Sequence, residues 1–97
     1  MPILQIEHRI RDYDMWKKAF DGDPLDRKGS GVRRHRIARP IDDPNYVVLD
    51  LGFDSVREAE AFLKGLHEKV WRSREASPAL ASPPQTRIVE ELEVDEY

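Results

Sequence analysis

The stretch Ile3-Leu-Gln-Ile-Glu-His-Arg-Ile10 decides the fold, because it is an extended segment whose two faces differ in kind. Successive side chains of a strand point to opposite sides of a sheet. One face therefore receives Leu4, Ile6, His8 and Ile10, and the other receives Ile3, Gln5, Glu7 and Arg9. The first face suits a hydrophobic core apart from its histidine. The second face must contact water, a ligand or another subunit.

A helix is predicted directly after this strand, from Tyr13 to Phe20. Asp12 is a suitable N-cap, and Tyr13, Trp16 and Phe20 recur at the spacing of one helix face. The following segment, residues 23–31, is rich in glycine and proline and is predicted to be a connecting loop.

Two extended runs follow, Val32 to Ile41 and Tyr46 to Phe53, and the residues between them favour a turn. They predict a hairpin. The first run carries several arginines and has no continuous apolar face, so we expect it to be an edge strand. In the second run, apolar side chains alternate with a mixed set, as in the first strand. The apolar set is Val47, Leu49, Leu51 and Phe53.

Ser55 and Glu58 have the spacing of a capping box, which predicts a second helix that extends to about Val70. Its buried stripe is expected to consist of Val56, Ala59, Leu63, Leu66 and Val70, with Phe62 and Trp71 at the margins. The small, proline-rich residues 77–84 predict a loop or flexible arm. A last strand is expected over residues 86–94.

This order of elements predicts an α+β chain of the ferredoxin-like βαββαβ type, with one domain over residues 1–97 and the first strand in the middle of a four-stranded antiparallel sheet. Two helices cover only one face of such a sheet. The uncovered face, mixed in polarity, is expected to pack against a second copy of the chain in a homodimer.

Composition excludes several classes of function. The chain has 39% hydrophobic and 36% charged residues and a net charge of −3, which argues against nucleic acid or a membrane surface as a partner. It contains no cysteine, so disulfides, thiolate catalysis and cysteine-ligated metals are excluded. No apolar run is long enough to span a membrane, and we expect a cytoplasmic protein.

Four runs carry a resemblance to a known group of proteins. They are Asp12-Tyr-Asp-Met-Trp-Lys-Lys-Ala-Phe-Asp21, Gly31-Val-Arg-Arg-His-Arg36, Asp42-Asp-Pro-Asn-Tyr46 and Phe53-Asp-Ser-Val-Arg-Glu-Ala-Glu-Ala-Phe62. With the order of elements, they resemble small bacterial members of the dimeric α+β barrel superfamily. That resemblance implies two ferredoxin-like sheets packed face to face. It does not select one activity, because the superfamily includes cofactor-free monooxygenases, polyketide cyclases, haem-degrading proteins and muconolactone isomerase.

His8 is the main candidate for chemistry. Its place beside Leu4 and Ile6 puts it under the helices, where a neutral imidazole could act as a general base. The alternative is a core histidine bonded to the backbone. His35, among the arginines, could assist beside an anionic substrate, or it could simply be an exposed strand residue.

Asp50 lies on the opposite face of the sheet, together with Glu7 and Arg9. Two readings are open. These charges form ion pairs with one another or with Arg34 or Arg36 across the dimer, or they line a polar ligand cavity in which Asp50 is a base and the arginines bind an anion.

Trp16, Tyr13 and Phe20 either line an aromatic pocket or belong to the core. The histidines have no metal-binding spacing, and no motif indicates a cofactor, so we expect neither a metal nor a cofactor.

Three functions therefore remain open: a homodimer that binds a small aromatic or anionic molecule, a cofactor-independent monooxygenase or cyclase/isomerase that uses His8, or a dimeric structural or regulatory module without a ligand. A pocket of roughly 300 Å³ at His8 would favour the first two. A closed interior filled by ion pairs would favour the third.

Overall fold

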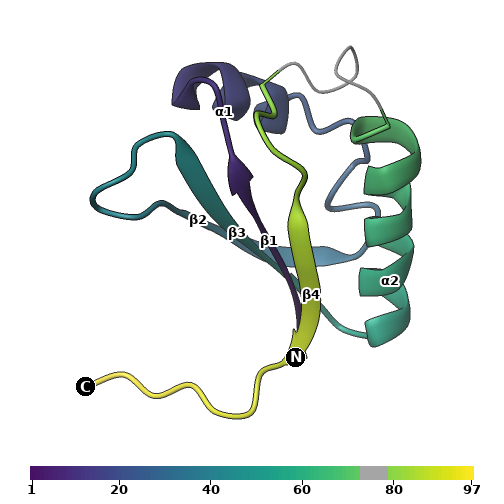
Figure 1. Cartoon of the computed structure of the whole chain (residues 1–97). Helices are drawn as coiled ribbons and strands as arrows, with labels where there is room; N and C mark the ends of the chain where they lie inside the picture. The colour runs from purple at the N-terminus through teal and green to yellow at the C-terminus, as the bar shows by residue number, and fades with distance from the viewer. Residues whose placement is uncertain (73–78) are drawn as a thin grey trace.

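The computed structural model describes residues 1–72 and 79–97 and contains a single sheet with its helices on one side (Figure 1). The elements in chain order are β1 Pro2–Arg9, α1 Tyr13–Asp21, β2 Val32–Ala38, β3 Tyr46–Phe53, α2 Val56–Gly65, the π-helical turn η1 Leu66–Val70 and β4 Gln85–Glu90. Within the described residues, no helix has the length and apolar character needed to cross a membrane.

The sheet has the strand order β2-β3-β1-β4, and all neighbouring strands are antiparallel. This is the ferredoxin-like order expected from the sequence. β1 lies inside the sheet and pairs with β3 through Ile6 and Leu49, and with β4 through Ile6 and Thr86. The arginine-rich β2 lies at one edge, as predicted. Its register with β3 shifts between Val32 and Arg34, where the strand contains an irregularity.

Both helices begin at the predicted caps. The Asp12 carboxylate accepts a hydrogen bond from the Met15 amide at 2.9 Å. The Ser55 hydroxyl accepts one from the Glu58 amide at 3.2 Å and also donates one to the Glu58 carboxylate at 3.1 Å. Each cap satisfies a backbone amide that the first helical turn leaves free.

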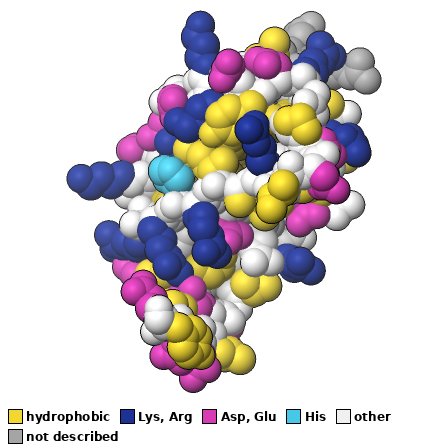
Figure 2. All heavy atoms as spheres, turned by 90° about the vertical axis from the view of Figure 1, so that its left-hand side faces the viewer, with side chains coloured by type: hydrophobic (Ala, Val, Ile, Leu, Met, Phe, Trp, Pro, Cys, Tyr) yellow, Lys and Arg dark blue, Asp and Glu magenta, His cyan; other side chains and the backbone are white. Residues whose placement is uncertain are grey.

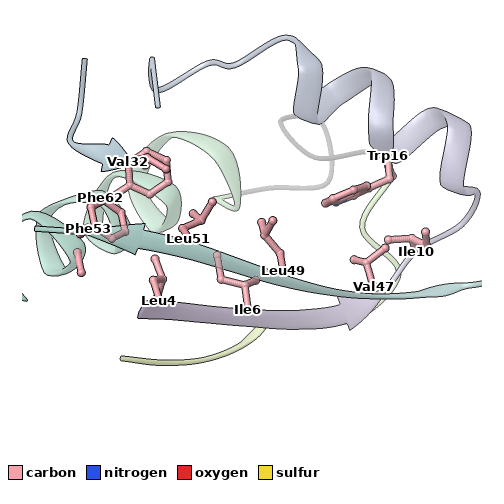
Figure 3. Close-up of a cluster of buried hydrophobic side chains, with 12 residues drawn as sticks. Leu4, Ile6, Ile10, Trp16, Val32, Val47, Leu49, Leu51, Phe53 and Phe62 are labelled. Atoms are coloured by element: carbon pink, nitrogen blue, oxygen red, sulfur yellow. The ribbon is translucent and has the colours of Figure 1, made fainter. Parts of the chain in front are cut away.

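The core lies between the sheet and the helices (Figure 3). The most deeply buried large side chains come from β1 and β3 and the residue after β1. They are Phe53, Leu4, Ile6, Ile10, Leu51 and Val47. Trp16 points from α1 toward the sheet and is 8% exposed (Figure 3). The strand alternation predicted from the sequence therefore holds on the helix-covered face.

The buried stripe of α2 differs from the prediction. Val56 is 50% exposed, whereas Phe62, expected at the margin, is 6% exposed and packs on Phe53 with ring centroids 5.7 Å apart. Val56 lies in the first turn of α2, beyond the core, so its place in the helical period does not bring it under the sheet.

The C-terminal part of the chain also differs. β4 ends at Glu90, which pairs with Pro2, the first residue of β1. The predicted strand to Val94 is wrong. Leu92 and Val94 are 86% and 64% exposed in a tail that leaves the body of the molecule (Figure 1).

Residues 77–84 were predicted to be a loop or a flexible arm, and residues 79–84 form a loop; residues 77 and 78 lie outside the described residues. Ala79 is 3% exposed, and its carbonyl accepts a hydrogen bond from the Arg11 amide at 3.0 Å. The Ser82 hydroxyl accepts one from the Arg9 amide at 2.9 Å. This segment is therefore attached to the end of β1.

Candidate functional site

A cavity of about 150 Å³ lies between the sheet, α1 and the end of the second helix. Its walls are largely apolar. The lining residues used below are His8, Trp16, Phe20, Arg27, Leu66 and Trp71. Both tryptophans of the chain border this cavity.

His8 is the polar group that β1 presents to the cavity, and it is 4% exposed. Its Nδ1 lies 2.9 Å from the Arg9 carbonyl oxygen. A carbonyl only accepts, so Nδ1 carries the proton, and in the neutral ring Nε2 is the acceptor. Burial lowers the pKa of His8, although the bond to the Arg9 carbonyl acts in the opposite direction. The ring is therefore neutral at pH 7, with a basic nitrogen fixed by the backbone.

An aromatic row extends from His8 across α1. Trp16 meets the His8 ring edge to face at 6.4 Å and stacks with Phe20 at 5.3 Å. Phe20 in turn contacts His35 at 5.1 Å. Edge-to-face and offset contacts of this kind hold rings in defined orientations.

Arg27 closes one side of the cavity and comes from the loop after α1. Its guanidinium carbon lies 3.7 Å from the centre of the Phe20 ring, and its Nη1 donates to the Phe20 carbonyl oxygen at 2.7 Å. Asp23 supports it, because its carboxylate accepts the Arg27 amide at 2.8 Å. The cavity wall thus contains the Arg27 guanidinium, which is held by the Phe20 ring, the Phe20 carbonyl oxygen and the Asp23 carboxylate.

The π-helical turn η1 forms the opposite wall. The Trp71 amide donates to the Leu66 carbonyl oxygen at 2.7 Å, a bond one residue longer than that of an α-helix. The extra residue changes the direction of the side chains that follow. Leu66, Val70 and Trp71 all line the cavity as a result.

The structure brings together only part of the site expected from the sequence. Trp16 and Phe20 line the cavity with His8, whereas Tyr13 packs behind Trp16 at 6.0 Å. His35 lies on the helix-covered side but is exposed, and it reaches His8 only through Phe20 and Trp16.

Asp50, Arg34 and Arg36 lie on the other side of the sheet from His8. The Asp50 carboxylate binds Arg36 at 3.0 Å, and Arg34 forms an ion pair with Glu91. Both pairs are made within one chain, whereas the ion-pair reading placed the pairs with Arg34 or Arg36 across the dimer. Among the described residues, no group hydrogen-bonds the buried Oδ1 of Asp50.

The open face, meaning the sheet face opposite the helices, contains further paired polar groups. The Tyr46 hydroxyl donates to the Glu7 carboxylate at 2.7 Å; that bond and burial raise the pKa of Tyr46. Arg87 donates to the Gln5 side chain at 2.9 Å. Arg9 forms an ion pair with Asp43 at 3.2 Å. A second pocket, of about 500 Å³ and bordered by Arg34, Arg36 and Asp50, lies among these groups.

Ile3 is an exception on the open face, since it is only 6% exposed. It pairs with Gly52 on β3. A Cβ atom at Gly52 would lie 3.0 Å from both the Met1 sulfur and the Arg34 Cγ, so these two side chains already cover this part of the sheet. Side chains of the same chain thus bury the apolar patch at this end.

Sequence reasoning missed Arg27, Leu66 and Trp71 as cavity residues that act together. The loop after α1 offered one signal, an isolated Leu25 next to Pro24 in polar surroundings. Leu25 contacts the second helix: a Cβ at Gly65 would lie 3.3 Å from its Cδ1. Within residues 1–72 and 79–97, no three His, Asp or Glu side chains gather in a way that could hold a metal ion.

The strand order, with the helices on one face of the sheet, defines the fold as ferredoxin-like α+β. No family model matches the sequence, and no curated protein matches it. Solved structures do match over nearly the whole chain.

Three of these structures illustrate the likeness. A protein of unknown function from Nitrosomonas europaea is 18% identical, with a TM-score of 0.72, covering 99% of this chain and 93% of that one. SnoaB, a cofactor-independent oxygenase from Streptomyces nogalater, is 14% identical, with a TM-score of 0.72 and coverage of 96% and 94%. A dimeric ferredoxin-like protein from an uncultured marine organism is 16% identical, with a TM-score of 0.67 and coverage of 96% of both chains. At these identities the likeness concerns the fold.

Proposed function

We propose that this protein is a homodimer that binds a small, single-ring aromatic molecule with a hydroxyl or carboxylate group in the cavity at His8. The observation that carries the proposal is the placement, in an aromatic cavity, of a neutral histidine whose acceptor nitrogen has no hydrogen-bond partner among the described residues. A phenol hydroxyl can donate to Nε2 while its ring packs between Trp16 and Trp71.

The size of the cavity limits the ligand. Its volume of about 150 Å³ is half of the roughly 300 Å³ expected at His8 for a binding protein or an enzyme, so the cavity does not reach that size. An apolar cavity of roughly this volume in another protein holds benzene. Ligands of one ring therefore fit, and polycyclic ligands require the walls to move.

The charge next to the cavity favours an anionic or electron-rich ring. Arg27 uses Nη1 for the Phe20 carbonyl, and its guanidinium has further donors available for a ligand carboxylate. Asp23 partly neutralises this cation at 3.5 Å, so a neutral phenol remains acceptable.

Intrinsic fluorescence tests the proposal directly, because both tryptophans border the cavity. Titration with phenol, hydroquinone and 4-hydroxybenzoate should change the emission saturably, with Kd on the order of 0.1–1 mM for ligands of this size. 2-Naphthol should bind more weakly. Absence of saturable binding by every single-ring ligand would refute the proposal and favour a structural module.

Two substitutions of His8 supply matched controls. In His8→Asn the amide nitrogen takes the place of Nδ1 and can still donate to the Arg9 carbonyl, but the acceptor at Nε2 is lost. In His8→Gln the amide reaches the position of Nε2. Phenol affinity should fall about tenfold in the first variant and less in the second, since one hydrogen bond contributes roughly 1–1.5 kcal/mol.

A cofactor-independent oxygenase is the second candidate, and the neutral His8 is the observation that favours it. A base with a lowered pKa can take the proton of a quinol hydroxyl, and the resulting anion is more easily oxidised by oxygen. SnoaB, described as such an oxygenase, has the same fold. Oxygen consumption with hydroquinones, abolished in His8→Asn, would establish an enzyme; binding without turnover would establish a binder.

The homodimer is supported by the open face. It combines half-buried apolar residues such as Val48 and Val89 with charges already paired inside the chain, so a second sheet can cover it without burying free charges. A protein of the same fold is described as dimeric. A monomer at micromolar concentration by light scattering would exclude this part of the proposal.

A further inference from the structure

The segment between α1 and β2, residues 23–31, belongs to no helix or strand and forms one wall of the cavity. Four of its residues line the cavity: Asp23, Pro24, Leu25 and Arg27. The segment runs from the end of α1 to the side of α2 (Figure 1). In the upper part of the molecule, where α1 lies, Figure 2 shows apolar side chains at the surface with a basic side chain among them. On this side a loop, and not regular structure, bounds the cavity.

Hydrogen bonds within the segment hold it in one shape. The Ser30 amide donates to the Asp26 carbonyl oxygen at 2.8 Å, and the Ser30 hydroxyl donates to the Leu25 carbonyl oxygen at 2.6 Å. The Asp26 carboxylate accepts the Gly29 amide at 3.2 Å. A loop that pairs its own backbone groups can move as one body without leaving those groups unpaired.

The segment contacts α1 and α2 in different ways. The Phe20 carbonyl oxygen of α1 accepts the Asp23 amide at 3.1 Å and Arg27 Nη1 at 2.7 Å. The contact with α2 is apolar, since a Cβ at Gly65 would lie 3.3 Å from Leu25 Cδ1 and 3.7 Å from Cδ2. Leu25 therefore packs directly on the helix where the helix has no side chain.

Both ends of the segment have backbone conformations that suit a hinge. Asp23, at the first end, has a φ angle of 50°, and Gly31, at the last, has a φ angle of 98°. Positive φ angles are uncommon and mark places where the chain changes direction sharply. Two such residues enclose the apolar contact of Leu25, and hinges of moving loops are a few residues of this kind.

We propose that residues 23–31 are a lid over the cavity, and that the contact between Leu25 and Gly65 controls how fast a ligand enters and leaves. His8 and Trp16 are 4% and 8% exposed, so a ring that reaches them must displace one wall. Backbone hydrogen bonds fix the sheet and the helices, whereas side-chain contacts hold the lid. The inference rests on the proposed ligand site and adds the part of the chain that admits the ligand.

Exchange of 4-fluorophenol, followed by ¹⁹F NMR, tests the Leu25 contact. Leu25→Ala should raise the association and dissociation rate constants about tenfold each and change Kd less than about threefold, because the lid opens more often whether or not a ligand is bound. Leu63→Ala is the matched control and should leave both rate constants unchanged. Leu63 is also half-buried against the core, but it lies outside the described lining of the cavity. A higher Kd with an unchanged association rate would mean that Leu25 only contacts the ligand, which overturns the lid.

A disulfide that closes the lid gives a measurement that needs no ligand. The natural chain has no cysteine, so Leu25→Cys with Gly65→Cys introduces a single pair. The oxidised protein should exchange 4-fluorophenol about tenfold or more slowly than the reduced protein, and acrylamide should quench its tryptophans less. Failure of the pair to form a disulfide would overturn the Leu25 contact.

The two measurements separate the lid from the proposed function. If the wild type binds no 4-fluorophenol but the disulfide still protects the tryptophans from acrylamide, the proposed function fails and the lid stands. If 4-fluorophenol binds but exchange and quenching are equal in the oxidised and reduced forms, the lid alone is overturned.

Discussion

The two faces of one sheet differ in almost every physical property. The helix-covered face is apolar, and on β1 its single polar side chain, His8, borders a cavity. The open face consists of polar groups that are paired within the chain, such as Asp50 with Arg36 and Glu7 with Tyr46. Polar side chains alone therefore do not identify a ligand-binding or catalytic site. An acceptor in an apolar cavity is available to a ligand, whereas a carboxylate in an ion pair already uses part of its bonding capacity, although Asp50 Oδ1 has no partner among the described residues.

The largest expected effect is a difference in folding stability between substitutions on the two faces. Leu51 is 1% exposed on the helix-covered face, so Leu51→Ala should lower the free energy of unfolding by about 2–5 kcal/mol. Val48, on the same strand but the other face, is the matched site. Val48→Ala should cost the isolated monomer about 1 kcal/mol or less. Urea unfolding measures both; equal losses would contradict the assignment of one face to the core.

The second effect concerns association. Val48 lies directly opposite Glu7 on β1, so Val48→Glu places two carboxylates side by side on the open face. The dimer Kd should rise about 100-fold, because a like-charge pair would have to be buried between subunits. Sedimentation measures the Kd. An unchanged Kd would mean that the subunits meet elsewhere.

The third effect distinguishes the ligands of the cavity. Arg27→Gln should weaken binding of 4-hydroxybenzoate about tenfold and leave phenol nearly unchanged, since only the former has a carboxylate for the guanidinium. Arg27→Lys is the control that keeps the charge but loses the planar donors. Equal losses for both ligands would indicate that Arg27 supports the wall through Phe20 rather than contacting the ligand.

The smallest effect is the pH dependence of stability. Burial lowers the pKa of His8 in the folded state below its usual value of 6.5, so the unfolded chain binds the proton more strongly. The stability that this group contributes is complete above pH 6.5 and decreases as the pH falls toward the folded pKa. His8→Asn should lack this part of the pH dependence, while His35 and His67 stay in both proteins. Parallel stability profiles for the two proteins would contradict the burial effect.

The element order, the strand faces and the two caps could be predicted from the sequence, because they depend on alternation and on local hydrogen bonds. His8 was placed correctly for the same reason. The end of β4 could not be predicted. Residues 91–94 alternate like a strand, but a strand needs a neighbour, and β1 begins at Pro2.

The cavity was predictable only in part. Helical spacing predicts that Trp16 and Phe20 share a face. Trp71 lines the cavity because of the π-helical turn before it, and no residue pattern in the sequence predicts such a turn. Arg27 depends on the path of a loop in which Asp23 and Asp26 have positive φ angles of 50° and 52°. Aspartate tolerates positive φ, but its residue type alone does not tell where in a loop that conformation occurs.

The most direct test of the central claim is a crystal structure with bound 4-bromophenol, whose bromine is located by anomalous scattering. Bromine is expected in the cavity between Trp16 and Trp71, with the phenol oxygen within about 3.2 Å of His8 Nε2. Bromine at the open face beside Asp50 and Arg36, with the cavity empty, would contradict the central claim.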